Sequence, residues 1–266
     1  MTSRIVAAFD RARSENRPAL ITLVIPGYPG RDETDAVFDA MVEGGADIVE
    51  VEIPFSDPLA DGTTIQRAAF TALENGTTTN DCLEFAKHAR GRHPETPIVF
   101  MTYLNPVLAY GLDRFAADAA AAGADGIILV DLPAEESERE RKAFAGHGID
   151  VVFLIAPTSS DERVERICKV AAGWVYCVSV AGVTGARSEL PEGLRGFIER
   201  VRRCTSLPLA VGFGISRREH VESLAGAADG VVVASALLDV IAAHKPGERA
   251  KAVREYVEVL SGRRRP

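Results

Sequence analysis

The segment ADIVEVEIPFSDPLADG, residues 46–62, joins an alternating apolar and acidic run to a loop rich in Pro, Asp and Gly. Alternate side chains of an extended strand point to opposite faces, so Glu50 and Glu52 share one face and the valines beside them share the other. A strand of a parallel sheet is covered on both faces, and an acid within it is either wrongly assigned or functional. Glu50 is therefore a candidate functional residue, and Asp61 in the following loop is a second.

Short β-rich runs of the same kind recur along the whole chain. Amphipathic stretches such as 113–124 and 161–172 fill the intervals and are long enough for the crossovers that parallel strands require. Eight such units predict a single (β/α)8 TIM barrel of the α/β class. An open doubly wound sheet is the alternative, but the even spacing and the lack of a GxGxxG turn after the first run disfavour it. The predicted strands are residues 19–25, 47–53, 97–101, 126–130, 151–155, 174–178, 208–212 and 230–234.

Length and composition indicate one domain over residues 1–266, with an N-terminal helix at about 2–16 and a basic, solvated tail at about 262–266. The net charge of -8 argues against a nucleic-acid surface. Four widely spaced cysteines form neither a CxxC pair nor a cluster with the five histidines, which predicts reduced thiols and no metal site. The chain shows no membrane span and no signal peptide, so we expect a cytoplasmic protein that does not bind membranes.

The active site of such a barrel lies at the C-terminal ends of its strands. Residues 180–187, 212–216 and 234–238 follow the last three predicted strands and are rich in Gly, Ser and Thr. Phosphate commonly binds backbone N–H groups after the seventh and eighth strands, at a helix N-terminus, although glycines also serve tight turns. The spacing predicts a phosphorylated small molecule as ligand, with Ser235 as a hydroxyl donor.

Five segments together carry a resemblance to a known family. They are ADIVEVEIPFSDPLADG, MTYLNPVLAYG (101–111), LVDLPAEES (129–137), SVAGVTGAR (179–187) and VGFGIS (211–216). In this order, and over nearly the whole chain, they resemble the tryptophan synthase α subunit. The resemblance implies a (β/α)8 barrel that cleaves indole-3-glycerol phosphate to indole and glyceraldehyde 3-phosphate by a retro-aldol reaction without a cofactor.

The resemblance also implies roles for individual residues. Glu50 would be the general acid and base at indole C3 and the glycerol hydroxyl, and Asp61 would accept the indole N–H and stabilise the positive charge. Two carboxyl groups in different environments suit these roles, because one must hold a proton and the other must stay charged. Tyr176 would line the site near both acids; a core aromatic residue is the alternative. The implied substrate-binding residues are Leu23, Tyr103, Leu129, Thr184, Gly185, Phe213, Gly214 and Ser235.

Two loops, the one containing Asp57 and residues 182–193, resemble those that close over the site and meet the tryptophan synthase β subunit. The family usually acts as a heterotetramer of two α and two β subunits. Two other functions remain open for this chain. It could be a stand-alone indole-3-glycerol-phosphate lyase, or a non-catalytic regulatory partner of a β subunit.

Two of the chain's departures from the family pattern lie within or directly after the segment 46–62. Glu52 stands where the family usually has Gly, and Thr63 stands where it usually has Pro. A second carboxylate on the face of Glu50 could retune or obstruct the site. Alternatively, Glu52 could pair with a basic residue in a polar pocket. The sequence leaves both interpretations open.

Overall fold

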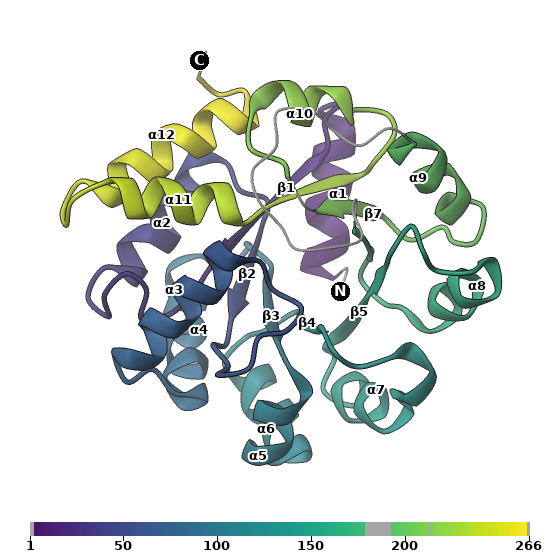
Figure 1. Ribbon diagram of the computed structural model, residues 1–266, viewed down its shortest axis with the longest axis horizontal. Coiled ribbons are helices and arrows are strands. Elements are labelled where there is room, and N and C mark those ends of the chain that lie inside the picture. Colours follow the sequence, from purple (N-terminus) through teal and green to yellow (C-terminus); the bar gives the residue numbers. More distant parts are fainter. Residues whose placement is uncertain (1–2, 179–192, 213, 265–266) are drawn as a thin grey trace.

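The computed structural model describes residues 3–178, 193–212 and 214–264. Eight parallel strands close into one barrel in chain order, and β1 pairs with both β2 and β8 (Figure 1). Each predicted strand is confirmed, within one residue at either end. The strands are β1 (Ala19–Val24), β2 (Ile48–Glu52), β3 (Ile98–Thr102), β4 (Gly126–Leu129), β5 (Asp150–Ile155), β6 (Val175–Val178), β7 (Leu209–Gly212) and β8 (Gly230–Val233).

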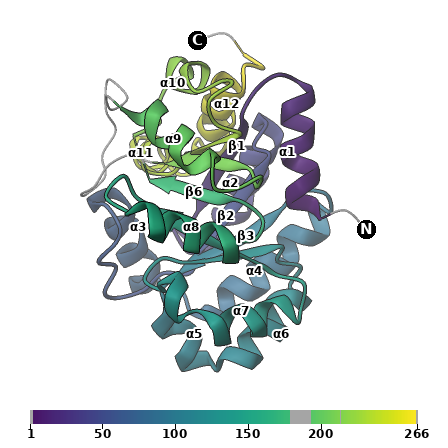
Figure 2. The same cartoon turned by 90° about the vertical axis from the view of Figure 1, so that its right-hand side faces the viewer.

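Helices surround the barrel and cover the outer face of the sheet (Figures 1 and 2). Their apolar residues recur every three or four positions and are buried, as at Ile65, Ala68, Ala69 and Ala72 of α3. The helices are α1 (Arg4–Ser14), α2 (Thr34–Gly44), α3 (Thr63–Glu74), α4 (Thr79–Arg92), α5 (Leu104–Tyr110), α6 (Leu112–Ala121), α7 (Glu138–Ala145), α8 (Asp161–Val170), α9 (Leu194–Arg202), α10 (Arg218–Ser223), α11 (Ser235–Ala243) and α12 (Arg249–Ser261), with a 3-10 turn, η1 (Ala134–Glu136).

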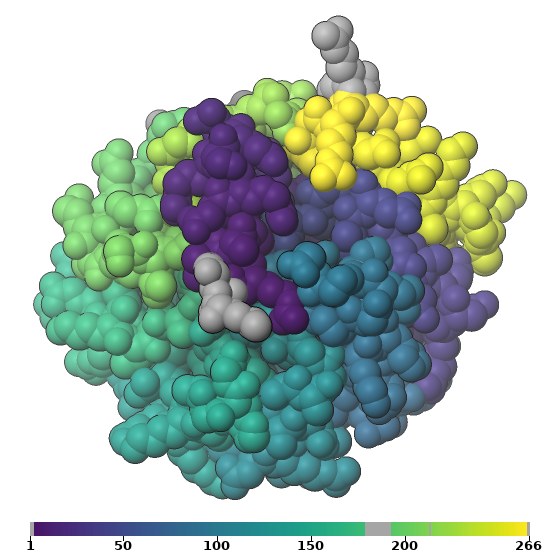
Figure 3. Space-filling view, turned by 180° about the vertical axis from the view of Figure 1, so that it is seen from behind, coloured from purple at the N-terminus to yellow at the C-terminus, as the bar shows by residue number. Residues whose placement is uncertain are grey.

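Helix α1 closes the N-terminal end of the barrel. The ring of Phe9 lies 6.0 Å from that of Trp174, which precedes β6, and a methyl group of Ile5 lies close to Gly126 and Gly173, at the starts of β4 and β6. Figure 3 shows α1 across this face, and Figure 2 shows it on the side opposite the loop that leads into α3. The opposite, C-terminal end is left for a functional site.

An aspartate stands directly before each of β2, β4 and β8 and binds the preceding strand in the sheet. Each accepts a hydrogen bond from a backbone N–H at the start of that strand and also pairs with at least one arginine. These charge-assisted bonds fix the strand starts and satisfy buried donors. The bonds join Leu20 to Asp47, Ile98 to Asp125 and Leu209 to Asp229, at 2.8, 2.9 and 2.8 Å.

The C-terminal helix α12 packs on α2, near the start of the chain. At Gly44 an added Cβ would lie 2.8 Å from the Cβ of Val257, so the two helices approach closely. Ser261 Oγ donates to the Gly44 carbonyl at 2.9 Å. Residues 262–264 are exposed, as a solvated tail would be, but Arg263 donates to the Glu43 carbonyl and Arg264 pairs with Glu255. The start of the basic tail is thus bonded to the barrel.

The four cysteines are free thiols, as the sequence predicts. Within residues 3–178, 193–212 and 214–264, no helix is long and apolar enough to cross a membrane. In the same ranges no three His, Cys, Asp or Glu side chains are grouped so as to hold a metal ion.

Candidate active site

Alternate residues of neighbouring strands line up in rows around the barrel. We call a row inner when its side chains face the barrel interior. Glu50 on β2 and Tyr176 on β6 lie on opposite sides of the barrel. Burial raises the pKa of Tyr176 well above its usual value, and the charge of Glu50 raises it further. Strand register carries the row of Glu50 through Val99, Gly126 and Leu154 to Tyr176, and the interaction of the two residues across the barrel fits an inward-facing row. Glu52 shares the row of Glu50, and Leu23 is in register with Glu50.

Glu50 is a buried acid whose Oε1 atom has no hydrogen-bond partner among the described residues. Its residue exposure is 1%, and burial raises its pKa to about 8. A carboxyl group loses its hydration in such a place, which disfavours the charged form. At neutral pH Glu50 therefore holds a proton that it can give to a substrate.

Asp61 is held in a different environment by Tyr103. The Tyr103 hydroxyl donates to Asp61 Oδ2 at 2.8 Å and accepts the Ala60 N–H at 2.9 Å. Gln66 donates to the Asp61 carbonyl at 2.9 Å, which fixes the loop from the side of α3. Burial raises the pKa of Asp61 to about 6, and the Tyr103 bond limits the rise. Asp61 is therefore charged at neutral pH, while Glu50 is not.

Tyr176 approaches β7 at a glycine. A Cβ added at Gly212 would lie 2.3 Å from the Tyr176 hydroxyl oxygen, far inside van der Waals contact. The ring of Tyr176 thus occupies the space that a side chain at position 212 would need. Because burial keeps its phenol protonated, Tyr176 offers the interior an O–H group near the two acids.

Glu52 is the third carboxyl group of this interior. Only 3% of the residue is exposed, and its Oε2 atom has no hydrogen-bond partner among the described residues. Burial raises its pKa well above the usual value, and the charges of Asp61 and Glu50 raise it further. No basic residue of the described ranges forms an ion pair with Glu52. The alternative in which Glu52 pairs with a basic residue is therefore not supported within these ranges.

Strand register corrects one predicted wall of the site. Leu129 pairs with Thr102, whereas Ile128 pairs with Met101, which in turn pairs with Glu52. The inner row therefore contains Met101 and Ile128, and Leu129 lies in the alternate, helix-facing row. Met101 and Ile128 were not among the residues expected to line the site, because the nearly all-apolar runs of β3 and β4 carry no signal that separates the inner row from the outer one.

The predicted phosphate site is described in part. Gly214 follows β7 with a φ of 83°, a left-handed conformation that favours glycine, and Ser235 is the first residue of α11. Strands β7 and β8 are paired, so both residues lie at the rim where the acids lie. The first N–H groups of a helix and its dipole attract anions. Thr184, Gly185 and Phe213 lie outside the described residues, as does most of the 182–193 loop.

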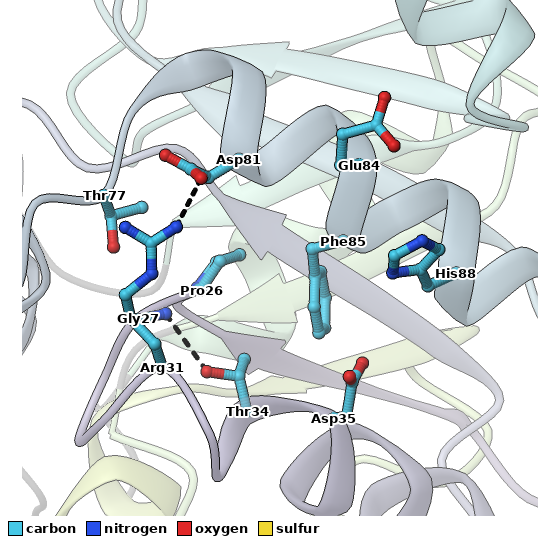
Figure 4. Close-up of a pocket in the computed structure, with 10 residues that line it drawn as sticks. All are labelled: Pro26, Gly27, Arg31, Thr34, Asp35, Thr77, Asp81, Glu84, Phe85 and His88. Carbon is cyan, nitrogen blue, oxygen red and sulfur yellow. Dashed lines mark hydrogen bonds and ion pairs between the residues drawn. The ribbon is translucent and has the colours of Figure 1, made fainter.

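A separate pocket of about 170 Å³ lies outside the barrel, between α2 and α4 (Figure 4). Pro26 and Gly27 form its floor after β1, and the Gly27 N–H donates to Thr34 Oγ1 at 3.1 Å. Arg31 and Asp81 form an ion pair at its edge. None of the candidate acids lines this pocket, which is therefore distinct from the site inside the barrel.

Comparisons with known proteins agree with this geometry. The family model described as tryptophan synthase alpha chain matches residues 9–263. The tryptophan synthase alpha chain of Roseiflexus castenholzii is 50% identical over 260 residues, which cover 98% of this chain and all of that protein. Tryptophan synthase of Saccharomyces cerevisiae is 42% identical over 264 residues, which cover 98% of this chain and 37% of that protein.

Solved structures give the same result. A tryptophan synthase structure from Mycobacterium tuberculosis matches with a TM-score of 0.90 and 38% identity, covering 98% of each chain. Tryptophan synthase subunit alpha from Legionella pneumophila matches with a TM-score of 0.89 and 36% identity, again over 98% of each chain. The chain therefore belongs to the tryptophan synthase alpha chain family.

Proposed function

We propose that this chain is a carbon–carbon lyase that cleaves indole-3-glycerol phosphate to indole and glyceraldehyde 3-phosphate in tryptophan biosynthesis. One observation carries the proposal. The barrel interior holds an acid that is protonated at neutral pH, Glu50, and an acid that is charged at neutral pH, Asp61. A retro-aldol reaction on an indole needs one group of each kind.

In the proposed mechanism Glu50 first gives its proton to indole C3. The indole ring becomes cationic, and Asp61 stabilises that charge by accepting a hydrogen bond from the ring N–H. The Glu50 carboxylate then takes the proton of the glycerol hydroxyl next to the ring, the carbon–carbon bond breaks, and an aldehyde forms. Glu50 ends the cycle protonated, so the proton balance closes on one residue, in line with the prediction that no cofactor takes part.

The proposed binding mode follows the distribution of groups around the rim. Leu23 lies beside Glu50 in the inner row, and Met101 and Ile128 supply further apolar surface. Tyr176 contributes an O–H group near the acids. The phosphate would bind near Gly214 and Ser235, together with the predicted contacts of Thr184, Gly185 and Phe213. Leu129 is not retained as a wall.

We also propose that the loops near Asp57 and at 182–193 meet a tryptophan synthase β subunit. Leu59, two residues after Asp57, is 91% exposed, and Leu108 on α5 is also exposed. Large apolar side chains on a rim suit a protein interface. The Saccharomyces cerevisiae relative adds support, because the region similar to this chain is about a third of a longer tryptophan synthase.

The test is indole release from indole-3-glycerol phosphate by the purified chain, measured with and without a tryptophan synthase β subunit. Slow turnover that the β subunit accelerates is the expected result. Fast turnover that does not depend on the β subunit would favour a stand-alone lyase. If the folded chain binds glycerol phosphate but releases no indole in either condition, the proposed reaction is wrong and a regulatory role takes its place.

A further inference from the structure

Glu52 is a buried carboxyl group that the proposed reaction does not use. It lies two residues beyond Glu50 in the same inner row, towards the C-terminal end of β2. Both Glu50 Oε1 and Glu52 Oε2 are buried without a hydrogen-bond partner among the described residues. A buried carboxylate needs donors to replace its lost hydration, whereas a protonated carboxyl group is itself a donor. This geometry favours the neutral form of both side chains.

The surroundings of Glu52 reinforce that preference. Among the described residues, the titratable groups that interact electrostatically with Glu52 are all acidic or neutral. They are Glu50 on β2, Asp61 in the loop before α3, Tyr103 after β3 and Cys82 on α4. Asp61 alone among the three carboxyl groups has a described O–H donor, Tyr103 at 2.8 Å. One negative charge can therefore be accommodated, and it belongs on Asp61.

We infer that Glu52 is a positioning residue that keeps its proton beside Glu50 and Asp61, so that the resting site carries its negative charge on Asp61 alone. The inference rests on the proposed function. When Glu50 gives its proton to indole C3, the carboxylate that remains has the O–H of Glu52 in the same row. A neighbouring donor favours the charged form, which lowers the barrier to this step. Glu52 keeps its proton throughout, and Glu50 recovers its own from the substrate hydroxyl.

The protonation of Glu52 is testable without turnover, by unfolding the full chain at a series of pH values. A carboxyl group whose pKa is raised in the folded state contributes stability that is complete below its unfolded pKa, and that stability is lost as the pH rises towards the folded pKa. Each proton so held makes the unfolding equilibrium constant rise tenfold per pH unit in that window. Glu52→Gln should therefore reduce the pH dependence of the unfolding equilibrium constant by one factor of ten per pH unit between about pH 5 and pH 7.

An infrared measurement makes the same test directly. At neutral pH the Glu52→Gln variant should lack one carbonyl stretching band of a protonated acid that the parent shows. In Asp61→Asn the Glu52 band should disappear at a lower pH than in the parent, because the charge of Asp61 no longer opposes ionisation of Glu52. Glu74→Gln, at an exposed position of α3, controls for the loss of a carboxyl group as such. If Glu52→Gln matches the parent in both the spectrum and the pH slope, Glu52 is ionised and the inference is wrong.

Kinetics test the positioning role. Glu52→Gln should lower kcat about three- to tenfold and leave KM unchanged, since an amide is a weaker donor than a carboxylic acid and the phosphate contacts lie elsewhere. A rise in kcat/KM in Glu52→Gly would show instead that Glu52 obstructs the site, and would overturn the positioning role. Absence of indole release by the parent chain would refute the proposed reaction, whereas the spectra and pH slopes would still decide the protonation of Glu52.

Discussion

The contact between Gly212 and Tyr176 allows a quantitative prediction for Gly212→Ala. The new Cβ would lie 2.3 Å from the tyrosine hydroxyl oxygen and 2.5 and 2.6 Å from two ring carbons. Ordinary contact begins near 3.4 Å, so the ring would have to move by about 1 Å within a packed interior. Overpacking of this kind costs about 1–3 kcal/mol of unfolding free energy. Displacement of an active-site group by about 1 Å can lower catalysis about 100-fold.

The prediction is checked by thermal unfolding and by kcat/KM for indole release. Each kcal/mol should lower Tm by about 2–4 °C in a protein of this size. Gly196→Ala in α9 is the matched control, because no heavy atom lies within 4 Å of its added Cβ, and it should stabilise the helix slightly.

A double substitution isolates the proposed cause. Tyr176→Phe removes the atom nearest the new Cβ, so Gly212→Ala should cost less unfolding free energy in the Tyr176→Phe background than in the parent. Strictly additive costs, or a Gly212→Ala variant as stable and active as the parent, would refute the steric argument.

Four further predictions concern the acids and their loop. The pH profile of kcat/KM should be bell-shaped, with activity lost as the pH falls through about 6, where Asp61 is protonated, and as it rises through about 8, where Glu50 loses its proton; a flat profile from pH 5 to 9 would contradict these roles. Tyr103→Phe should raise the pKa of Asp61 by removing its 2.8 Å hydrogen bond, and the acid limb of the profile should move to higher pH, which the same titration measures. Glu50→Gln should lower turnover at least about 100-fold while calorimetry still detects glycerol-phosphate binding, and retained turnover would place the acid elsewhere. Thr63→Pro should stabilise the protein by about 0.4–1 kcal/mol in denaturant unfolding, because position 63 is the first residue of α3 and Gly62 has the extended conformation that a following proline requires; a loss of stability would mean that this conformation is not kept.

Much of the fold could be predicted because β-rich runs and amphipathic stretches alternate without interruption. Which face of each strand points into the barrel was harder to predict. In β2 the acids Glu50 and Glu52 mark the face that is chemically special. In β4 the run GIIL is apolar at every position, so the sequence carries no sign of which alternate residues face inward. Leu129 was therefore assigned to the wrong face, and only the register with β3 corrected it.

The site could be predicted where a residue type carries the chemistry, and not where a tertiary contact does. In one specific motif, Glu50 stands out as an acid within a covered strand, and Asp61 stands out in the loop that follows. The bond from Tyr103 to Asp61 joins residues 42 positions apart, and the glycine that admits Tyr176 lies on a neighbouring strand. Such contacts depend on how the barrel closes, which local sequence patterns do not encode.

The docking of α12 on α2 has a consequence for folding during synthesis on the ribosome. The bond from Ser261 to Gly44 joins residues 217 positions apart, and β8 must reach β1 before the barrel has no open edge. Non-local pairing of this kind is slow, and unpaired strand edges are prone to aggregate. A nascent chain that has emerged only as far as β7 still presents two such edges, on β1 and β7. These edges remain prone to aggregation until β8 has been translated and pairs with both strands. A truncation before α12 keeps β8 but uncovers the face of α2 on which α12 packs, and it should therefore reduce the yield of folded protein in cells, even though every candidate active-site residue is still present.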